Sequence, residues 1–330
     1  MVRMRRRILL TAMAAGLMPG RLLARPLPLR RLGVLWSGRA DDPVNKSRVS
    51  ALVGRLAALG WGENGNLKIE WRWTAGGTAH TARYAAELTR AGPDALLAIA
   101  TPSVMALRRQ TKTIPIVFTS VTDPVGQGFV ESLAHPGGNI TGFTDFDPPM
   151  AGKWLEMLTQ IVPRVGRAAQ LYNPVTAPFA AAMIHVVDAV APALGVTVRT
   201  TPVHDDSQIE AVVADLAREP RGGLLVLPDS FTGIHEAAIL GLTAQHRVPA
   251  VYWARGFAES GGLMSYGIDP IDPWRRAALY IDRIFKGAKP GELPVQNPTK
   301  FELVVNLATA KALGVTFAPT LLASAADVIE

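Results

Sequence analysis

From Arg30 onward, short apolar runs alternate with longer segments whose apolar residues have helical spacing. The strand-like runs cover residues 32–36, 67–71, 95–100 and 114–118, and the helical patterns cover 46–59, 78–91 and 102–110. Continuous apolar strands separated by helices indicate a parallel sheet with both faces covered. The pattern therefore predicts a doubly wound α/β fold.

The second half of the chain repeats this pattern. Residues 31–36 are echoed by 167–172, 95–103 by 223–230, and 113–118 by 247–252. The offsets stay between 128 and 136 residues, which favours two similar Rossmann-like lobes, although all such units share strand and turn chemistry.

The segments that would connect the two lobes predict three crossings. Residues 137–146 carry the chain into the second lobe, and a return is expected near 267–270, so that a helix at 272–285 lies on the first lobe. The Pro-rich residues 290–298 suit a third crossing. We expect lobe 1 to comprise 30–144 with about 269–296, and lobe 2 to comprise 145–268 with about 297–330, joined by a hinge.

Composition removes several functional classes. The chain has 330 residues, a length that suits two α/β lobes, and it contains no cysteine. Disulfide scaffolds, thiolate metal sites, cysteine nucleophiles and a lipid-modified cysteine are thereby excluded. The net charge is +7, but five arginines without any acid lie in the first 24 residues, which leaves +2 for the rest. A nearly neutral body predicts no nucleic-acid partner.

The N-terminal residues have the order of a secretory signal. Arg5, Arg6 and Arg7 precede an apolar run at 8–18, and Pro19, Gly20 and Leu22-Leu23-Ala24 follow, so residues 1–24 are predicted to be a removed signal peptide, although Leu22 is large for a cleavage site. The three arginines also fit the twin-arginine export pattern, and ordinary export remains the alternative. A third possibility is an amphipathic extension on a cytoplasmic protein. No apolar run reaches the roughly 18 residues of a transmembrane helix.

The common signatures of α/β enzymes are missing. The chain has no GxGxxG after its first strand, no GxxxxGK[ST] and no GxSxG, and its six histidines do not have zinc-hydrolase spacing. We therefore expect no cofactor, no metal and no catalysis. The rival interpretation is an enzyme that uses Asp123 or Asp229 as a general base in a cleft between the lobes.

Polar side chains gather in the loops that follow the predicted strands. In open α/β sheets, ligands bind beyond the carboxyl ends of the strands. The candidate ligand-binding residues are Trp36, Ser37, Thr101, Ser103, Ser120, Asp123, Thr144, Asn173, Asp229, Ser230 and Tyr266. Hydroxyls and amides suit a carboxylate, while Asp123 or Asp229 suits an ammonium group, so the set favours an amino-acid-like zwitterion. The alternatives are that the polar residues only cap helices and that the aromatic residues only pack.

Several motifs are similar to those of a known family. They are Thr101-Pro-Ser103, Ile114-Pro-Ile-Val-Phe118, Asp123-Pro-Val-Gly126, Pro136-Gly-Gly-Asn-Ile-Thr-Gly-Phe143, Gly152-Lys-Trp-Leu155, Leu227-Pro-Asp229, Gly261-Gly-Leu-Met-Ser-Tyr-Gly-Ile-Asp269 and Lys300-Phe-Glu-Leu303. The chain resembles the periplasmic substrate-binding proteins of ABC transporters that have the type I binding-protein fold. The group that it resembles includes tryptophan- and tyrosine-binding members.

The resemblance implies a periplasmic, non-catalytic monomer that closes two hinged lobes around a small-molecule ligand and docks on a membrane permease. In the family, loops from both lobes line the cleft, which corresponds here to Trp36, Ser37, Thr101, Asp123, Asn173, Asp229 and Tyr266. The predicted ligand is amino-acid-like and possibly aromatic. A ligand-sensing partner of a membrane receptor would need the same lobes, so that role stays open beside transport.

Overall fold

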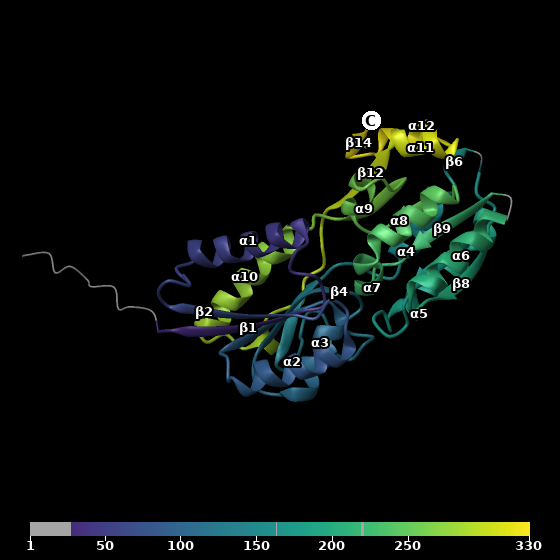
Figure 1. Cartoon of the computed structure of the whole chain (residues 1–330). Helices are drawn as coiled ribbons and strands as arrows, with labels where there is room; N and C mark the ends of the chain where they lie inside the picture. Colours follow the sequence, from purple (N-terminus) through teal and green to yellow (C-terminus); the bar gives the residue numbers. More distant parts are fainter. Residues whose placement is uncertain (1–27, 163, 219–220) are drawn as a thin grey trace, which may run out of the picture.

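The computed structural model describes residues 28–162, 164–218 and 221–330, which form two lobes side by side (Figure 1). The predicted signal peptide at 1–24 lies outside the described residues. Within those ranges, no helix is both long and apolar enough to cross a membrane.

The first lobe is built on a parallel sheet with strand order β2-β1-β3-β4-β5. Its strands are β1 (Arg30–Trp36), β2 (Leu67–Trp73), β3 (Ala95–Ile99), β4 (Ile116–Val121) and β5 (Ile140–Thr144). Helices α1 (Pro43–Ala58) and α10 (Asp272–Phe285) cover one face, and α2 (Thr78–Arg90) and α3 (Thr101–Gln110) cover the other (Figure 1). Both faces of these strands are therefore buried, which explains their continuous apolar runs.

The second lobe contains a sheet with order β14-β12-β11-β10-β9-β7-β8. Its strands are β7 (Arg167–Tyr172), β8 (Thr197–Pro202), β9 (Gly222–Val226), β10 (Ala250–Tyr252), β11 (Met264–Ile268), β12 (Phe301–Asn306) and β14 (Asp327–Ile329). Read from its other edge, β8-β7-β9-β10-β11 repeats the order of the first sheet. The repeated sequence pattern thus corresponds to a repeated topology.

The helices of the second lobe also lie on both faces of its sheet. Helices α4 (Met150–Leu158) and α5 (Ala180–Leu194) pack on one face, and α6 (Asp206–Arg218) and α8 (Glu236–Gln245) pack on the other. The remaining elements are α7 (Ser230–Ile234), α9 (Arg255–Glu259), α11 (Leu307–Leu313), α12 (Pro319–Ala323), the short helix η1 (Pro290–Glu292), and the antiparallel pair β6 (Ile161–Val162) and β13 (Thr316–Phe317).

Two strands of the second sheet depart from the predicted parallel arrangement, because β12 runs antiparallel to β11 and β14 runs parallel to β12. The parallel strands of both sheets end at the side where the lobes meet, and the chain enters β12 from that same side after leaving α10 and η1. A strand that starts there must run away from the junction. The second sheet is therefore mixed, as sheets with a returning edge strand commonly are.

The crossing segments are joined by side-chain hydrogen bonds. Thr144 Oγ1 and Asn297 Oδ1 are 2.8 Å apart, and Asn297 Nδ2 donates to Asp147 Oδ2 at 3.1 Å. Phe143 and Gln296 also form an isolated parallel bridge. Two crossings are thereby held against each other where the lobes meet.

Candidate ligand-binding site

A cavity of about 210 Å³ lies between the two lobes. Its walls come from loops after β1, β3, β4, β7, β9 and β10, together with the crossing segments and the first turns of α1 and α8. Because both lobes supply its walls, a ligand in this space would be enclosed by protein from two sides.

Six of the eleven predicted site residues line this cavity: Trp36, Ser37, Thr101, Ser120, Asp229 and Ser230. The other five, Ser103, Asp123, Thr144, Asn173 and Tyr266, are not part of its lining. The loops after the strands thus meet as expected, but the individual side chains within them point in different directions.

The backbone of the first lobe is strained at the cavity. Ala100, Ser120 and Asp123 have φ values of 68°, 58° and 46°, in the left-handed region that residues with a Cβ rarely adopt. Ser120 lies where the register between β4 and β5 shifts, so a bulge places it in the cavity wall. Such strain is typical of functional sites, where the surrounding structure enforces it.

Asp229 is a buried carboxylate, 5% exposed, at the end of β9. It accepts hydrogen bonds from the Asn173 amide at 2.8 Å, the Thr176 hydroxyl at 2.5 Å and the Phe231 amide at 3.0 Å. Burial raises its pKa to about 6, although these three donors act against the rise. Asp229 caps α7 and also fixes the loop after β7, so most of its acceptor sites are already used.

A second buried carboxylate, Asp145, was not predicted. It lies in the crossing after β5, is 8% exposed and lines the cavity. Its Oδ1 accepts hydrogen bonds from the Thr122 hydroxyl and the Phe146 amide, both at 2.8 Å, whereas no described residue donates to Oδ2. Burial raises the pKa of Asp145 to about 6. This carboxylate is held rigidly and keeps one oxygen available for a cation.

Trp36 does not offer a ring face to a ligand. Its indole is 3% exposed and lies between those of Trp73 and Trp274, with both ring centroids 4.3 Å away. Trp36 therefore contributes little accessible surface to the cavity wall. The aromatic and apolar surface comes instead from Phe146, Phe179, Ile234 and Trp253.

Four of the five remaining candidates form hydrogen bonds to other protein groups instead of lining the cavity. Ser103 Oγ lies 3.2 Å from Ser37 Oγ, and Thr144 bonds to Asn297 in the crossing described above. The carboxylate of Asp123 turns back on its own loop and accepts the Gly126 amide at 2.8 Å. Asn173 Oδ1 accepts the Val175 amide at 2.8 Å. These residues shape the loops that line the cavity.

Tyr266, the fifth, packs in the core of the second lobe. Its ring lies near that of Phe301, with centroids 5.9 Å apart, and its carbonyl accepts the Trp154 indole N–H at 2.8 Å. The interpretation of Tyr266 as a packing residue therefore fits the observed contacts better than that of a ligand platform.

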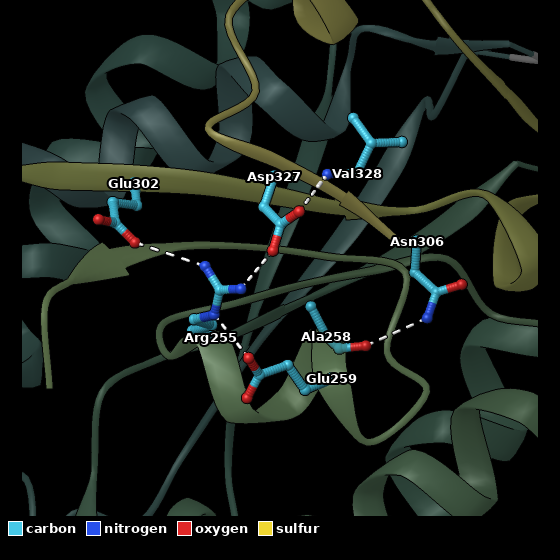
Figure 2. Close-up of polar contacts among 7 residues, drawn as sticks. All are labelled: Arg255, Ala258, Glu259, Glu302, Asn306, Asp327 and Val328. Atoms are coloured by element: carbon cyan, nitrogen blue, oxygen red, sulfur yellow. Dashed lines mark hydrogen bonds and ion pairs between the residues drawn. The ribbon is translucent and has the colours of Figure 1, made fainter. Parts of the chain in front are cut away.

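One end of the cavity is charged. Asp42, Arg39 and Arg48 come from the first lobe, and Glu236, Arg255 and Glu259 come from the second. Arg255 is fixed by several carboxylates: it donates to Glu259 at 2.6 Å, lies 3.6 Å from Glu302 and bonds to Asp327 (Figure 2). These contacts fasten the cavity-lining helix α9 to β12 and β14, so this wall is rigid.

The lobes also touch directly beside the cavity. A Cβ atom placed on Gly76, in the loop after β2, would lie 2.8 Å from Cδ1 of Ile234 in α7. Gly76 has φ +79°, so a residue with a side chain is disfavoured there for two reasons. The two lobes therefore approach each other closely at this point.

The described residues contain no cluster of three or more acidic or histidine side chains that could hold a metal ion.

Two α/β lobes of one topology, joined by several crossings and enclosing a ligand-sized cavity, define a hinged solute-binding protein. The family model for ABC transporter substrate binding protein matches residues 41–329 of this chain. The chain therefore belongs to that family, and the type I binding-protein fold predicted for it is confirmed.

Individual relatives agree with this assignment. The chain is 26% identical over 275 residues to a tyrosine-binding protein of Clostridioides difficile, covering 82% of this chain and 76% of that protein. The structure of an ABC domain from Streptococcus pneumoniae in complex with L-Trp has a TM-score of 0.83 and 27% identity, covering 91% and 100% of the two chains. A conserved domain protein of Vibrio cholerae also has a TM-score of 0.83, with 29% identity and coverage of 91% and 99%.

Proposed function

We propose that this protein is the extracytoplasmic solute-binding component of an ABC importer and that its ligand is an aromatic amino acid. The observation that carries the proposal is the combination, in one cavity between the lobes, of a buried carboxylate with an open oxygen, Asp145, and walls of aromatic and apolar residues. The tyrosine-binding and L-Trp-bound relatives support the same ligand class.

The ammonium group would bind Asp145, whose buried position strengthens a charge pair. The side chain would lie against Phe146, Phe179 and Trp253, which offer apolar area and ring contacts. A ligand favours closure only if it binds the closed form more tightly than the open form. A ligand that touches both lobes meets this condition. The closed protein would then dock on its membrane permease. We further propose that the protein acts as a monomer and catalyses no reaction.

Isothermal titration calorimetry with L-tryptophan, L-tyrosine, L-phenylalanine, L-leucine and glucose tests the ligand class. We expect binding of at least one aromatic amino acid with a submillimolar Kd, weaker binding of leucine and none of glucose. Mass spectrometry of the recovered ligand should find it unchanged. Tight binding of glucose without any amino acid would refute the proposed ligand.

Localisation is tested separately. We expect the protein in the extracytoplasmic fraction of its native host. Export by the twin-arginine route stays a prediction, and replacing Arg5 and Arg6 by lysine should block export only if that route operates.

A further inference from the structure

Three arginines from the described chain line the cavity, and they differ in their charge partners. Arg39 lies on the exposed rim and pairs with Asp41 at 3.3 Å. Arg255 is surrounded by Glu259, Glu302 and Asp327 (Figure 2). Arg48, in the middle of α1, has no carboxylate within the 4.0 Å of an ion pair in the described part of the chain.

The guanidinium of Arg48 is oriented by one hydrogen bond. Its Nη1 donates to Asn45 Oδ1 at 3.0 Å, and Asn45 is itself fixed because its Nδ2 donates to the Arg39 carbonyl at 2.8 Å. The Nε atom of Arg48 is buried and has no hydrogen-bond partner among the described residues. The edge formed by Nε and Nη2 is therefore the unused edge of this guanidinium, and two parallel N–H groups on one edge match the two oxygens of a carboxylate.

Arg48 is partly buried, and a guanidinium shielded from water is costly unless it has a counter-ion and hydrogen-bond acceptors. Asp42 and Glu236 lie near enough to influence Arg48 electrostatically but not near enough to pair with it. The structure thus holds a positive group in a ligand cavity without its direct counter-ion. Ser230 adds a second unsatisfied group from the opposite lobe, since its Oγ is buried, has no partner among the described residues and belongs to a cavity-lining residue.

We propose that the Nε–Nη2 edge of Arg48 binds a carboxylate group of the ligand, so that the cavity selects solutes that carry a free carboxylate as well as a cation. The inference rests on the proposed function and extends it, because it assigns a second polar anchor to the first lobe. An amine that lacks the carboxylate would leave Arg48 unpaired and would bind more weakly.

A different role for Arg48 would be a charge latch that attracts Glu236 across the cleft and favours closure whatever the ligand. The two roles make different predictions. A latch weakens every ligand equally when Arg48 is changed, and Glu236→Gln has the same effect as Arg48→Gln. A carboxylate anchor affects only ligands with a carboxylate, and Glu236→Gln leaves their affinity unchanged or improves it, because a competing negative charge is removed.

The experiment compares ligands that differ only in the carboxylate. L-Tryptophan and tryptamine, and L-tyrosine and tyramine, are titrated calorimetrically at pH 7.5 into the wild type, Arg48→Gln, Arg48→Lys, Glu236→Gln and the control Arg55→Gln. We expect Arg48→Gln to weaken binding of the amino acid by about 10- to 100-fold and that of the amine by less than about threefold. Arg48→Lys should lose less affinity than Arg48→Gln, because lysine keeps the positive charge. It should still lose some affinity, because lysine lacks the two parallel N–H groups. Arg55→Gln should change neither ligand by more than about threefold, because Arg55 is exposed on the same helix and lies outside the cavity lining.

Equal losses for the amino acid and its amine in both Arg48 variants would overturn the proposal, as would an amino acid that binds no better than its amine in the wild type. A melting curve of each variant checks that it is folded, and Arg48→Lys keeps the test valid if Arg48→Gln unfolds. Failure of the proposed function has a separate signature, since the wild type would then bind neither member of either pair.

Discussion

Replacing Asp145 by asparagine should stabilise the ligand-free protein while removing ligand binding. Burial raises the pKa of Asp145 from its ordinary value of 3.8 to about 6, and two pKa units correspond to about 3 kcal/mol. In the unfolded chain the same carboxyl ionises near pH 3.8, so burying its charged form lowers the free energy of unfolding. This loss of stability is absent below about pH 4, grows as the pH rises, and is complete above about pH 6.

Asparagine avoids this cost and can keep the local hydrogen bonds. Its Oδ1 can still accept from Thr122 and Phe146, as the Asp145 Oδ1 does. Its Nδ2 would take the place of the open oxygen and would repel an ammonium group. At pH 8 the variant should therefore be more stable than the wild type by up to about 3 kcal/mol, or roughly 5 °C in Tm, and at pH 4 the two should melt alike.

Thermal unfolding followed by circular dichroism between pH 4 and pH 8 measures this difference without ligand. Asp123→Asn is the matched control, because that carboxylate is partly exposed, bonds to its own loop and lies outside the cavity. It should cause no loss of ligand. If the advantage of Asp145→Asn is the same at pH 4 and pH 8, or if the variant still binds L-tryptophan like the wild type, the reasoning is wrong.

Three further predictions follow from the cavity and its walls. Affinity for an aromatic amino acid should fall by up to about tenfold per pH unit below pH 6, where Asp145 takes up a proton; a Kd that stays constant from pH 8 to pH 5 would contradict this. Gly76→Ala should weaken binding by resisting closure against Ile234, and the double variant with Ile234→Ala should recover part of the loss; no recovery in calorimetry would show that the contact is irrelevant. Trp36→Ala should cost about 3–5 kcal/mol in urea unfolding, because its ring is packed on both faces, and an unchanged stability would disprove that packing role.

The architecture was predictable from sequence because it depends on local periodicity repeated along the chain. The three pairs of similar segments that indicated two lobes form β1 and β7, β3 and β9, and β4 and β10. The two strands of each pair occupy equivalent positions in their sheets. The direction of β12 was not predictable in this way, since no residue pattern within a strand records from which side the chain enters the sheet.

The sequence could predict which loops line the cavity, but not which side chains in them face it. Asp123 and Asp229 both follow a strand and both precede or follow a proline, so they look equivalent in the sequence. Their side chains differ because Asp123 has a left-handed backbone and folds onto the Gly126 amide, whereas Asp229 is extended and caps α7 from within the cavity wall. A single backbone angle decides such orientations, and residue types do not encode it clearly.

Asp145 was missed for another reason, which also bears on mechanism. It follows β5 directly in a crossing, and sequence reasoning treated crossings as connections rather than as binding surface. Its neighbours Thr144 and Asp147 are both bonded to Asn297 on another crossing. The carboxylate that we assign to the ligand is therefore on the segment about which the lobes must turn. An ammonium group held by Asp145 removes the cost of its buried charge only when the lobes enclose both, so ligand charge and lobe closure are coupled at one residue.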